Sequence, residues 1–187
     1  MPDSPQIADP HLKDMTLTKL ILFCCLSQAA FGASLGTGEP MPAVRGKNLN
    51  EKTVELPKDI AGKPAVLAFG FSKDAGVPVR SWAAIVQKEF PNVPVFQIPV
   101  LEGVPRLFRG FAVSGIRNDT PTANREFLVL LYQDEKLWRD RLEVKDDKQA
   151  YLVVLDSQGR VARRVTGLGT DEQKQSLKTV LEALKPN

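Results

Sequence analysis

The run AVLAFGF at residues 65–71 is almost continuously apolar, and it is the most informative segment of this chain. Runs of this kind are typical of a central β-strand that is covered on both faces. The loop SKDAGVP (72–78) follows it, and we expect a helix from about Val79 to Phe90. The apolar side chains of that helix recur at helical spacing: Trp82, Ile85, Val86 and Phe90.

Further strands and helices are expected on both sides of this unit. The expected strands cover residues 53–56, 95–100, 127–132, 151–155 and 161–166. A turn at 156–159 should join the last two strands into a hairpin. A final helix should begin at Thr170, because Thr170 to Gln173 fits a capping box. The charged residues 133–148 form either a short helix or a long hairpin arm.

Another helix is expected over residues 104–116. Its spacing of apolar residues predicts one inward face, made of Leu107, Phe108, Phe111 and Ala112. The complete order is then strand, helix, strand, helix, strand, hairpin and helix. A right-handed βαβ unit followed by an antiparallel hairpin and a closing helix describes the thioredoxin fold. We therefore expect an α/β, thioredoxin-like protein in which helices flank a central mixed β-sheet.

The N-terminal region carries a separate signal. An apolar run from Leu20 to Ala30 follows Lys19 and precedes small residues, which is typical of a secretory signal peptide. The best signal begins at Met15, so we expect export to the periplasm, or a membrane tether if the leader is not cleaved. The expected parts are an N-terminal extension with the signal peptide (1–32, the signal at about 15–32), a linker (33–50) and a thioredoxin-like domain (51–187).

The positions of cysteine and histidine exclude several function classes. Cys24 and Cys25 lie in the apolar run, and His11, the only histidine, precedes it. A processed chain would hold neither residue type, which excludes thiol–disulfide exchange and the usual zinc, copper and haem sites. The net charge of the 187 residues is only +3, without a long basic run, so nucleic acid is not an expected partner. No motif for a metal or another cofactor is present, and we expect none.

The loop after residue 71 lies where a thioredoxin fold carries its reactive thiols, before a helix whose dipole lowers a thiol pKa. It resembles the loop of exported TlpA-like and SCO-type proteins, in which an apolar strand ending in Phe precedes the active loop. Aligned on Phe71, the first cysteine position falls on Asp74. Aligned on Asp156, the position of the cis-proline that faces the thiols falls on Ala150. Both departures argue against a redox role.

A closer resemblance covers most of the chain after the leader. It rests on four segments and a later glycine: Phe71 to Trp82, Phe96 to Glu102, Arg106 to Arg109, Ala150 to Arg160, and Gly167. The chain resembles the mitochondrial ATP synthase assembly-factor family (the Atp-ten family), whose thioredoxin-like domains lack the cysteine pair. The resemblance implies a role in the assembly of a membrane subunit of the ATP synthase. Because the leader indicates a bacterial cell-surface compartment, the mitochondrial client is not carried over.

Six residues are candidates for binding a partner: Lys73, Asp74, Arg80, Trp82, Arg106 and Arg109. Lys73 and Asp74 could form an amine–carboxylate pair that acts on a substrate; the plainer interpretation is a loop ion pair or a charge that suits the helix dipole. Trp82 is either a ligand platform or part of the core. Arg106 and Arg109 belong to an amphipathic segment that either lies on anionic lipid or forms a solvated helix face.

A last candidate patch combines Tyr132 and Trp138 with Arg139 and Arg141. Such residues are enriched at interface hot spots, and the alternative is a loop packed on its own sheet.

Our leading hypothesis is a non-catalytic, exported, thioredoxin-like protein that holds a protein partner or membrane subunit during assembly. The partner would bind in a groove beside the 72–80 loop and the 104–117 segment. A second hypothesis is a small-molecule enzyme or binder that uses Lys73, Asp74 or Arg80. A third is a diverged relative of the thioredoxin oxidoreductases, either without thiol activity or with an unusual redox group. We assign no catalytic residue, and the oligomeric state is open.

Overall fold

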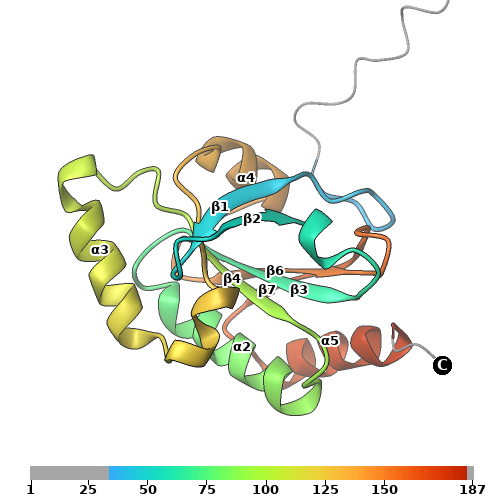
Figure 1. Cartoon of the computed structure of the whole chain (residues 1–187). Helices are drawn as coiled ribbons and strands as arrows, with labels where there is room; N and C mark the ends of the chain where they lie inside the picture. The colour runs from blue at the N-terminus through green and yellow to red at the C-terminus, as the bar shows by residue number, and fades with distance from the viewer. Residues whose placement is uncertain (1–33, 185–187) are drawn as a thin grey trace, which may run out of the picture. The chain divides into compact units, whose positions relative to one another are not determined.

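The computed structural model describes residues 34–184, which form the expected α/β thioredoxin-like fold (Figure 1). A four-stranded sheet runs in the order β4-β3-β6-β7. Strands β3 and β4 are parallel, whereas β6 is antiparallel to β3 and to β7. The strands are β3 (Ala65–Gly70), β4 (Val95–Pro99), β6 (Ala150–Leu155) and β7 (Val161–Gly167). Every residue of β3 and β6 is buried, which explains why both strands are continuous apolar runs.

A second sheet of three strands runs in the order β2-β1-β5. Its strands are β1 (Val44–Asn48), β2 (Thr53–Leu56) and β5 (Val129–Leu130), with short 3₁₀ helices at Lys58–Ile60 and Thr122–Phe127. Two parallel bridges, Gln97 with Leu128 and Val100 with Leu131, connect the β5 segment to β4. The strand predicted at 127–132 therefore contacts both sheets, although its regular part is short.

The predicted linker is wrong, because residues 34–50 belong to the folded domain and contain β1. Leu35 is buried, and its main-chain N–H donates to the carbonyl oxygen of Arg141 at 3.0 Å. The N–H of Gly38 donates to the carbonyl oxygen of Val161 at the start of β7, at 2.7 Å. The glycines and prolines of this segment suggested a tether, but its few apolar side chains find places in the core, and their burial holds it there.

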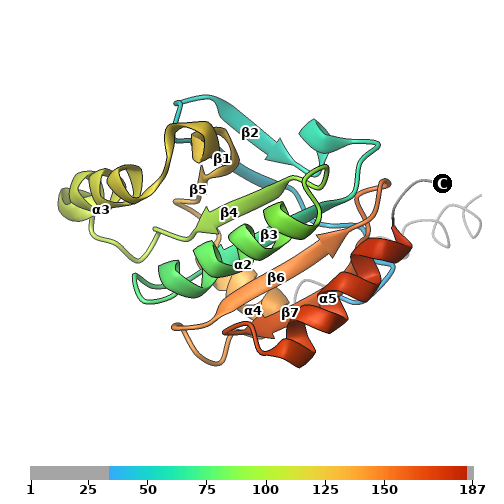
Figure 2. The same cartoon turned by 90° about the horizontal axis from the view of Figure 1, so that it is seen from below.

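Helices α2 (Gly76–Glu89) and α5 (Asp171–Ala183) cover one face of the four-stranded sheet (Figure 2). Their apolar side chains, including Trp82 and Leu177, pack against residues of β3 and β6 such as Ala68 and Leu152. The predicted capping box of α5 is present, since the hydroxyl oxygen of Thr170 accepts from the N–H of Gln173. Both predicted helices are therefore present, although α2 begins at Gly76, three residues before the predicted start at Val79.

Helix α4 (Glu135–Leu142) packs against the other face of this sheet. Residues 133–148 thus form a short helix rather than a hairpin arm. The indole of Trp138 lies against the ring of Phe69 from β3, with ring centroids 5.1 Å apart. Apolar side chains of β1 and β2, such as Val44 and Leu56, join the same cluster. The N-terminal strands and α4 therefore share one core.

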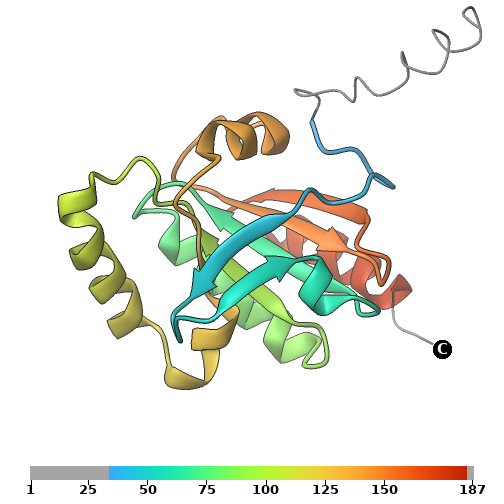
Figure 3. The same ribbon diagram turned by 45° about the horizontal axis from the view of Figure 1, so that its top comes forward.

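Helix α3 (Arg106–Asp119) lies to one side of the sheets, and its orientation differs from the sequence prediction (Figures 1 and 3). Leu107, Phe108 and Phe111 are 80%, 55% and 78% exposed, so the prediction that they face inward is wrong. The opposite face packs through Val113 and Ile116 on a small apolar cluster beside β5. Helical spacing correctly identifies an apolar face, but α3 has two of them, and packing selects the less bulky one.

The predicted signal peptide at 15–32 lies outside the described residues, as do Cys24, Cys25 and His11, so that prediction stays untested. Among residues 34–184, no helix combines the length and the apolar character that crossing a bilayer requires.

Candidate partner-binding site

The loop between β3 and α2 holds two of the predicted site residues. Lys73 and Asp74 are exposed, and neither side chain forms a hydrogen bond or ion pair within residues 34–184. The predicted ion pair between them is therefore not formed. The loop is instead held by Ser72, whose hydroxyl donates to the carbonyl oxygen of Asp147 at 2.6 Å and accepts from the N–H of Ala75 at 3.2 Å. Asp74, the residue that the alignment on Phe71 places at the first cysteine position, is an exposed carboxylate without a partner among the described residues.

The position predicted to lack the cis-proline is also visible. Ala150 begins β6, is fully buried and pairs with Gly167 of β7. Within the described residues, the one cis peptide bond is Leu56–Pro57, so the bond before Ala150 is trans. Residues 34–184 contain neither cysteine nor histidine. The part of the chain that folds as a thioredoxin-like domain therefore offers no thiolate for disulfide exchange.

Trp82 is part of the core, so its prediction as a partner-binding residue is wrong. Its side chain is fully buried between α2 and the sheet. The indole Nε1–H donates to the carbonyl oxygen of Gly167 at 3.1 Å. The apolar stripe of α2 already contained the signal for this outcome, because a tryptophan at core spacing is buried unless something holds it out.

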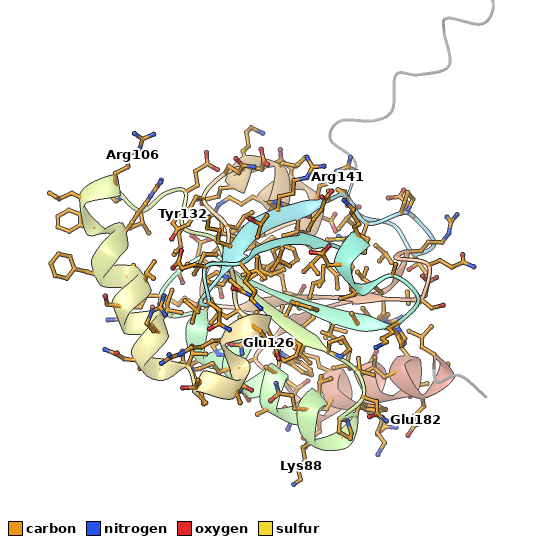
Figure 4. The ribbon with its side chains drawn as sticks, viewed as in Figure 1. Lys88, Arg106, Glu126, Tyr132, Arg141 and Glu182 are labelled. Atoms are coloured by element: carbon orange, nitrogen blue, oxygen red, sulfur yellow. The ribbon has the colours of Figure 1, made fainter. Side chains whose placement is uncertain are left out.

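The side chains of Arg106 and Arg109 point in different directions, although both residues lie in the first turn of α3. Arg106 is exposed and points away from the sheets (Figure 4). Arg109 turns inward, where its Nε donates to the carbonyl oxygen of Val104 at 2.9 Å. Its guanidinium also lies over the ring of Tyr132, 5.2 Å from the centroid. Arg109 therefore fixes the loop before α3, and only Arg106 is free to meet a partner.

In the other proposed patch, Trp138 and Tyr132 also differ in how accessible they are. Trp138 is buried against Phe69 and is unavailable to a partner. Tyr132 is half-buried; burial raises the pKa of its phenol, the charge of Glu51 adds to this, and Arg109 opposes it.

Arg139 belongs to a network that holds the loops at this end of the sheet. Its guanidinium forms a two-point ion pair with Asp147, at 2.6 and 2.9 Å, and a further ion pair with Glu135 at 2.8 Å. It also lies over the ring of Phe71. The hydrogen bond from Arg139 lowers the pKa of the Asp147 carboxyl, although partial burial acts in the opposite direction. The network thus connects α4, which carries Glu135 and Arg139, to the segment before β6 that carries Asp147.

Three residues that the prediction had placed in the core form an exposed apolar surface. We call Leu107, Phe108 and Phe111 the α3 outward face. The only ionisable side chains from 103 to 118 are arginines, so this surface carries basic and no acidic neighbours on its own helix. Leu107, Phe108 and Phe111 recur at the spacing of one helical face, which was the correct signal. Their exposure depends on packing against β5, which local sequence does not reveal.

The predicted groove between the 72–80 loop and the 104–117 segment is present as a small cavity. Its volume is about 60 Å³, and we call it the α2 cavity. It brings together Ser72, Gly76 and Arg80 from the loop and α2 with Gln97 of β4 and Ile116 of α3. Arg80 lies at this cavity, with its Nη1 3.8 Å from Oδ2 of Asp119. Of the six predicted residues, only Arg80 lines the cavity.

Comparison with known proteins agrees with this architecture. No protein-family model matches the chain, and no curated protein matches it. Among solved structures, it is similar to a DsbE-type thiol:disulfide interchange protein from Chlorobium tepidum, with 19% identity and a TM-score of 0.59 over 81% of this chain and 99% of the other. It is also similar to BsSco, a member of the Sco family of cytochrome c oxidase assembly proteins (13% identity, TM-score 0.54, covering 80% and 96%).

A third similar structure is a SCO1/SenC family lipoprotein from Bacillus anthracis, with 14% identity and a TM-score of 0.54 over 78% of this chain and 95% of the other. These likenesses extend over nearly the whole length of the compared chains. Identities of this size establish the fold and nothing finer. The TlpA-like and SCO-type resemblance seen in the sequence is therefore confirmed at the level of the thioredoxin-like fold.

Proposed function

We propose that this chain is an exported, non-redox, thioredoxin-like binding protein that holds a membrane-associated protein partner during assembly. The single observation that carries the proposal is the α3 outward face, where Leu107, Phe108 and Phe111 are all exposed on one helix. Large apolar side chains that cluster on a surface mark interaction sites more often than scattered ones do.

The chemistry of the thiol position supports binding over catalysis. Asp74 is an exposed carboxylate with no base, acid or metal ligand paired to it within the described residues. General acid–base and nucleophilic catalysis usually depend on a second group held within hydrogen-bond reach of the first, and Asp74 has no such neighbour among the described residues. The fold thus keeps the scaffold of an oxidoreductase while the described part lacks its nucleophile.

The energetic case rests on how much apolar surface a partner could cover. Burial of a Leu or Phe side chain is worth about 1.5–3 kcal/mol. Because each residue of the α3 outward face is already partly covered, a partner that buries all three gains roughly 3–6 kcal/mol before the costs of association. That gain alone supports a weak or transient complex, as suits a factor that releases its client.

Charge indicates which partner fits. Arg106 stands free at the start of α3, and no acidic residue lies on the helix before Asp119. We therefore propose an apolar or amphipathic helix of a membrane-associated protein, with acidic residues at its edge, as the occupant. The Sco family, to which the similar structure BsSco belongs, consists of cytochrome c oxidase assembly proteins, and this similarity and the Atp-ten resemblance both support an assembly function.

Affinity capture from detergent-solubilised membranes tests this proposal. The bait pair is the wild type and a Phe108→Ser/Phe111→Ser double variant, with Leu168→Ser as the matched control because Leu168 is an exposed apolar residue away from α3. We expect one membrane protein, identified by mass spectrometry, to be recovered with the wild type and the control but lost with the double variant. Recovery by all three baits, or by none, would overturn the proposal.

Sedimentation with vesicles provides the second arm. If the purified protein binds vesicles of anionic phospholipid, and the double variant does not, the occupant of the α3 outward face is lipid and the protein partner is wrong.

A further inference from the structure

The α2 cavity lies at the carboxyl ends of β3 and β4, beside the start of α2. Gly70 ends β3, Pro99 ends β4, and Gly76 is the first residue of α2; all three line the cavity. This edge of a parallel strand pair is where α/β proteins place ligands, because strand ends and helix starts converge there. The volume of about 60 Å³ is several times the space that one water molecule needs.

Gln97 is the unusual residue of this cavity. It lies in the middle of β4, between the apolar residues Phe96 and Ile98, and is only 7% exposed. Its side chain lines the cavity and forms no hydrogen bond with any other residue between 34 and 184. Its carboxamide atoms are not among the fully buried, unpartnered side-chain atoms of the described residues, so they reach solvent at the cavity. An otherwise buried residue thus offers a carboxamide donor and acceptor that no described residue uses and that a ligand in the cavity can bond.

The surroundings of Gln97 favour an anion. Arg80 lines the cavity with a guanidinium that has five N–H donors, and within residues 34–184 its one ion-pair partner is Asp119, at 3.8 Å. The N-terminal end of α2, where Gly76 lies, carries the positive end of a 14-residue helix. None of the described residues that line the cavity is acidic. The remaining wall is apolar and includes Val79 and Leu128.

We propose that the α2 cavity binds a carboxylate. Two carboxylate oxygens in one plane match the fork of Arg80 on one side and the carboxamide N–H₂ of Gln97 on the other. The apolar wall accommodates the one or two carbons next to the carboxyl group, and the small volume excludes a larger acid from complete burial. The site is separate from the α3 outward face, and the proposal does not depend on that surface.

Two sources can supply this group: a free short-chain carboxylic acid, or the C-terminal carboxylate of a protein segment. The chemistry of recognition is the same for both. The source decides whether the cavity serves as a small-molecule site or as a socket for a chain end, so the test includes one arm for each.

The full chain is titrated with sodium acetate at constant pH and ionic strength, with chloride as the balancing anion, while ¹H–¹⁵N spectra are recorded. We expect saturable shifts of the Gln97 side-chain amide and of the Gly70 and Gly76 main-chain amides, with a Kd of roughly millimolar size for so small a ligand. Acetamide, which has the same shape without the charge, should produce no such shifts.

Variants assign the binding to the cavity. Arg80→Gln should weaken acetate binding by about tenfold or more, because it removes a charge-assisted pair of hydrogen bonds. Gln97→Leu should weaken it as well, read from the glycine amides. Asp119→Asn should tighten it, since the Asp119 carboxylate competes for Arg80. Matched controls are Arg45→Gln and Asp171→Asn, which remove exposed ion-paired charges elsewhere and should change nothing.

A peptide arm separates the sources. Acetyl-Gly-Ala with a free carboxyl group should bind more tightly than acetate, and its amidated form should not bind, if the cavity receives a chain end. Tighter binding of acetate or propionate identifies a free acid instead. Shifts that do not saturate, acetate binding by Arg80→Gln equal to the wild type, or preference for inorganic phosphate would each overturn the carboxylate site. None of these results bears on the α3 outward face, whose test uses other variants.

Discussion

Replacement of Trp82 by Phe tests whether this residue belongs to the core or to a binding surface. The structure buries the indole completely and gives Nε1 a hydrogen bond to the carbonyl oxygen of Gly167 at 3.1 Å. Loss of that hydrogen bond costs about 0.5–1.5 kcal/mol. Loss of the second ring leaves a void between α2 and the sheet, for which we add about 1–2 kcal/mol, well below the 3–5 kcal/mol of a complete truncation to Ala. We expect the free energy of unfolding to fall by about 1.5–3.5 kcal/mol.

The measurement is urea unfolding followed by far-UV circular dichroism, with the slope of the transition compared between variants. The matched control is Phe111→Ala on α3, because this aromatic residue is 78% exposed. We expect the control to change the free energy of unfolding by less than about 0.5 kcal/mol, the usual range for a surface substitution. A loss below about 0.5 kcal/mol for Trp82→Phe, or one above about 1.5 kcal/mol for Phe111→Ala, would refute the assignment of both residues.

Four further outcomes follow from the structure. Asp147→Asn should lower the free energy of unfolding at pH 7 but have no effect at acid pH. The hydrogen bond from Arg139 lowers the pKa of Asp147 in the folded state, so the stabilisation by this carboxylate is present above the unfolded pKa and is lost as pH falls through the folded pKa. Equal dependence of stability on pH in the wild type and the variant would contradict this. Gly46→Ala should destabilise the domain by about 1–3 kcal/mol, because the new Cβ would clash with the carbonyl oxygen of Leu130, and chemical denaturation would measure it. The purified protein should not accelerate the reduction of insulin disulfides by dithiothreitol, and turbidity above the uncatalysed rate would restore a redox role. Mass spectrometry of protein from the native host should find an N-terminus near residue 33, and an intact residue 15 would contradict cleavage of the leader.

The parts of the fold that sequence predicts well are those fixed by local chemistry. The apolar run at 65–71 predicts β3 because a strand covered on both faces needs no alternation. The hairpin of β6 and β7 and the capping box at Thr170 depend on residues a few positions apart. In each case the deciding contacts are short in sequence, so inspection of one segment is enough.

The errors concern contacts between distant segments. Residues 33–50 were expected to be a linker, yet Leu35 is buried and its main-chain N–H donates to the carbonyl oxygen of Arg141. Leu107 and Phe111 were expected in the core, but β5 accepts the opposite face of α3. Which of two apolar helix faces is buried depends on the shape of the partner surface, which no local pattern contains.

The candidate site was predicted in location but not in composition. Arg80 was correctly placed beside a groove, whereas Trp82 and Arg109 have structural roles. Gln97 was missed, although one polar residue within an apolar strand was a usable signal. The sequence could not show that the carboxamide of Gln97 lines a cavity without a hydrogen-bond partner among residues 34–184.

The hydrogen bonds of residues 35–38 to the rest of the domain determine where a shortened version of the protein can begin. Main-chain hydrogen bonds at Leu35 and Gly38 hold it to the α4 region and to the start of β7. A truncated version beginning at residue 51 would lose β1, uncover one side of β5 and leave the first residues of β7 as a bare edge open to other chains. Expression clones, fusion tags and protease sites should therefore be placed before Leu35, and shorter versions are expected to aggregate rather than to behave as trimmed forms of the same protein.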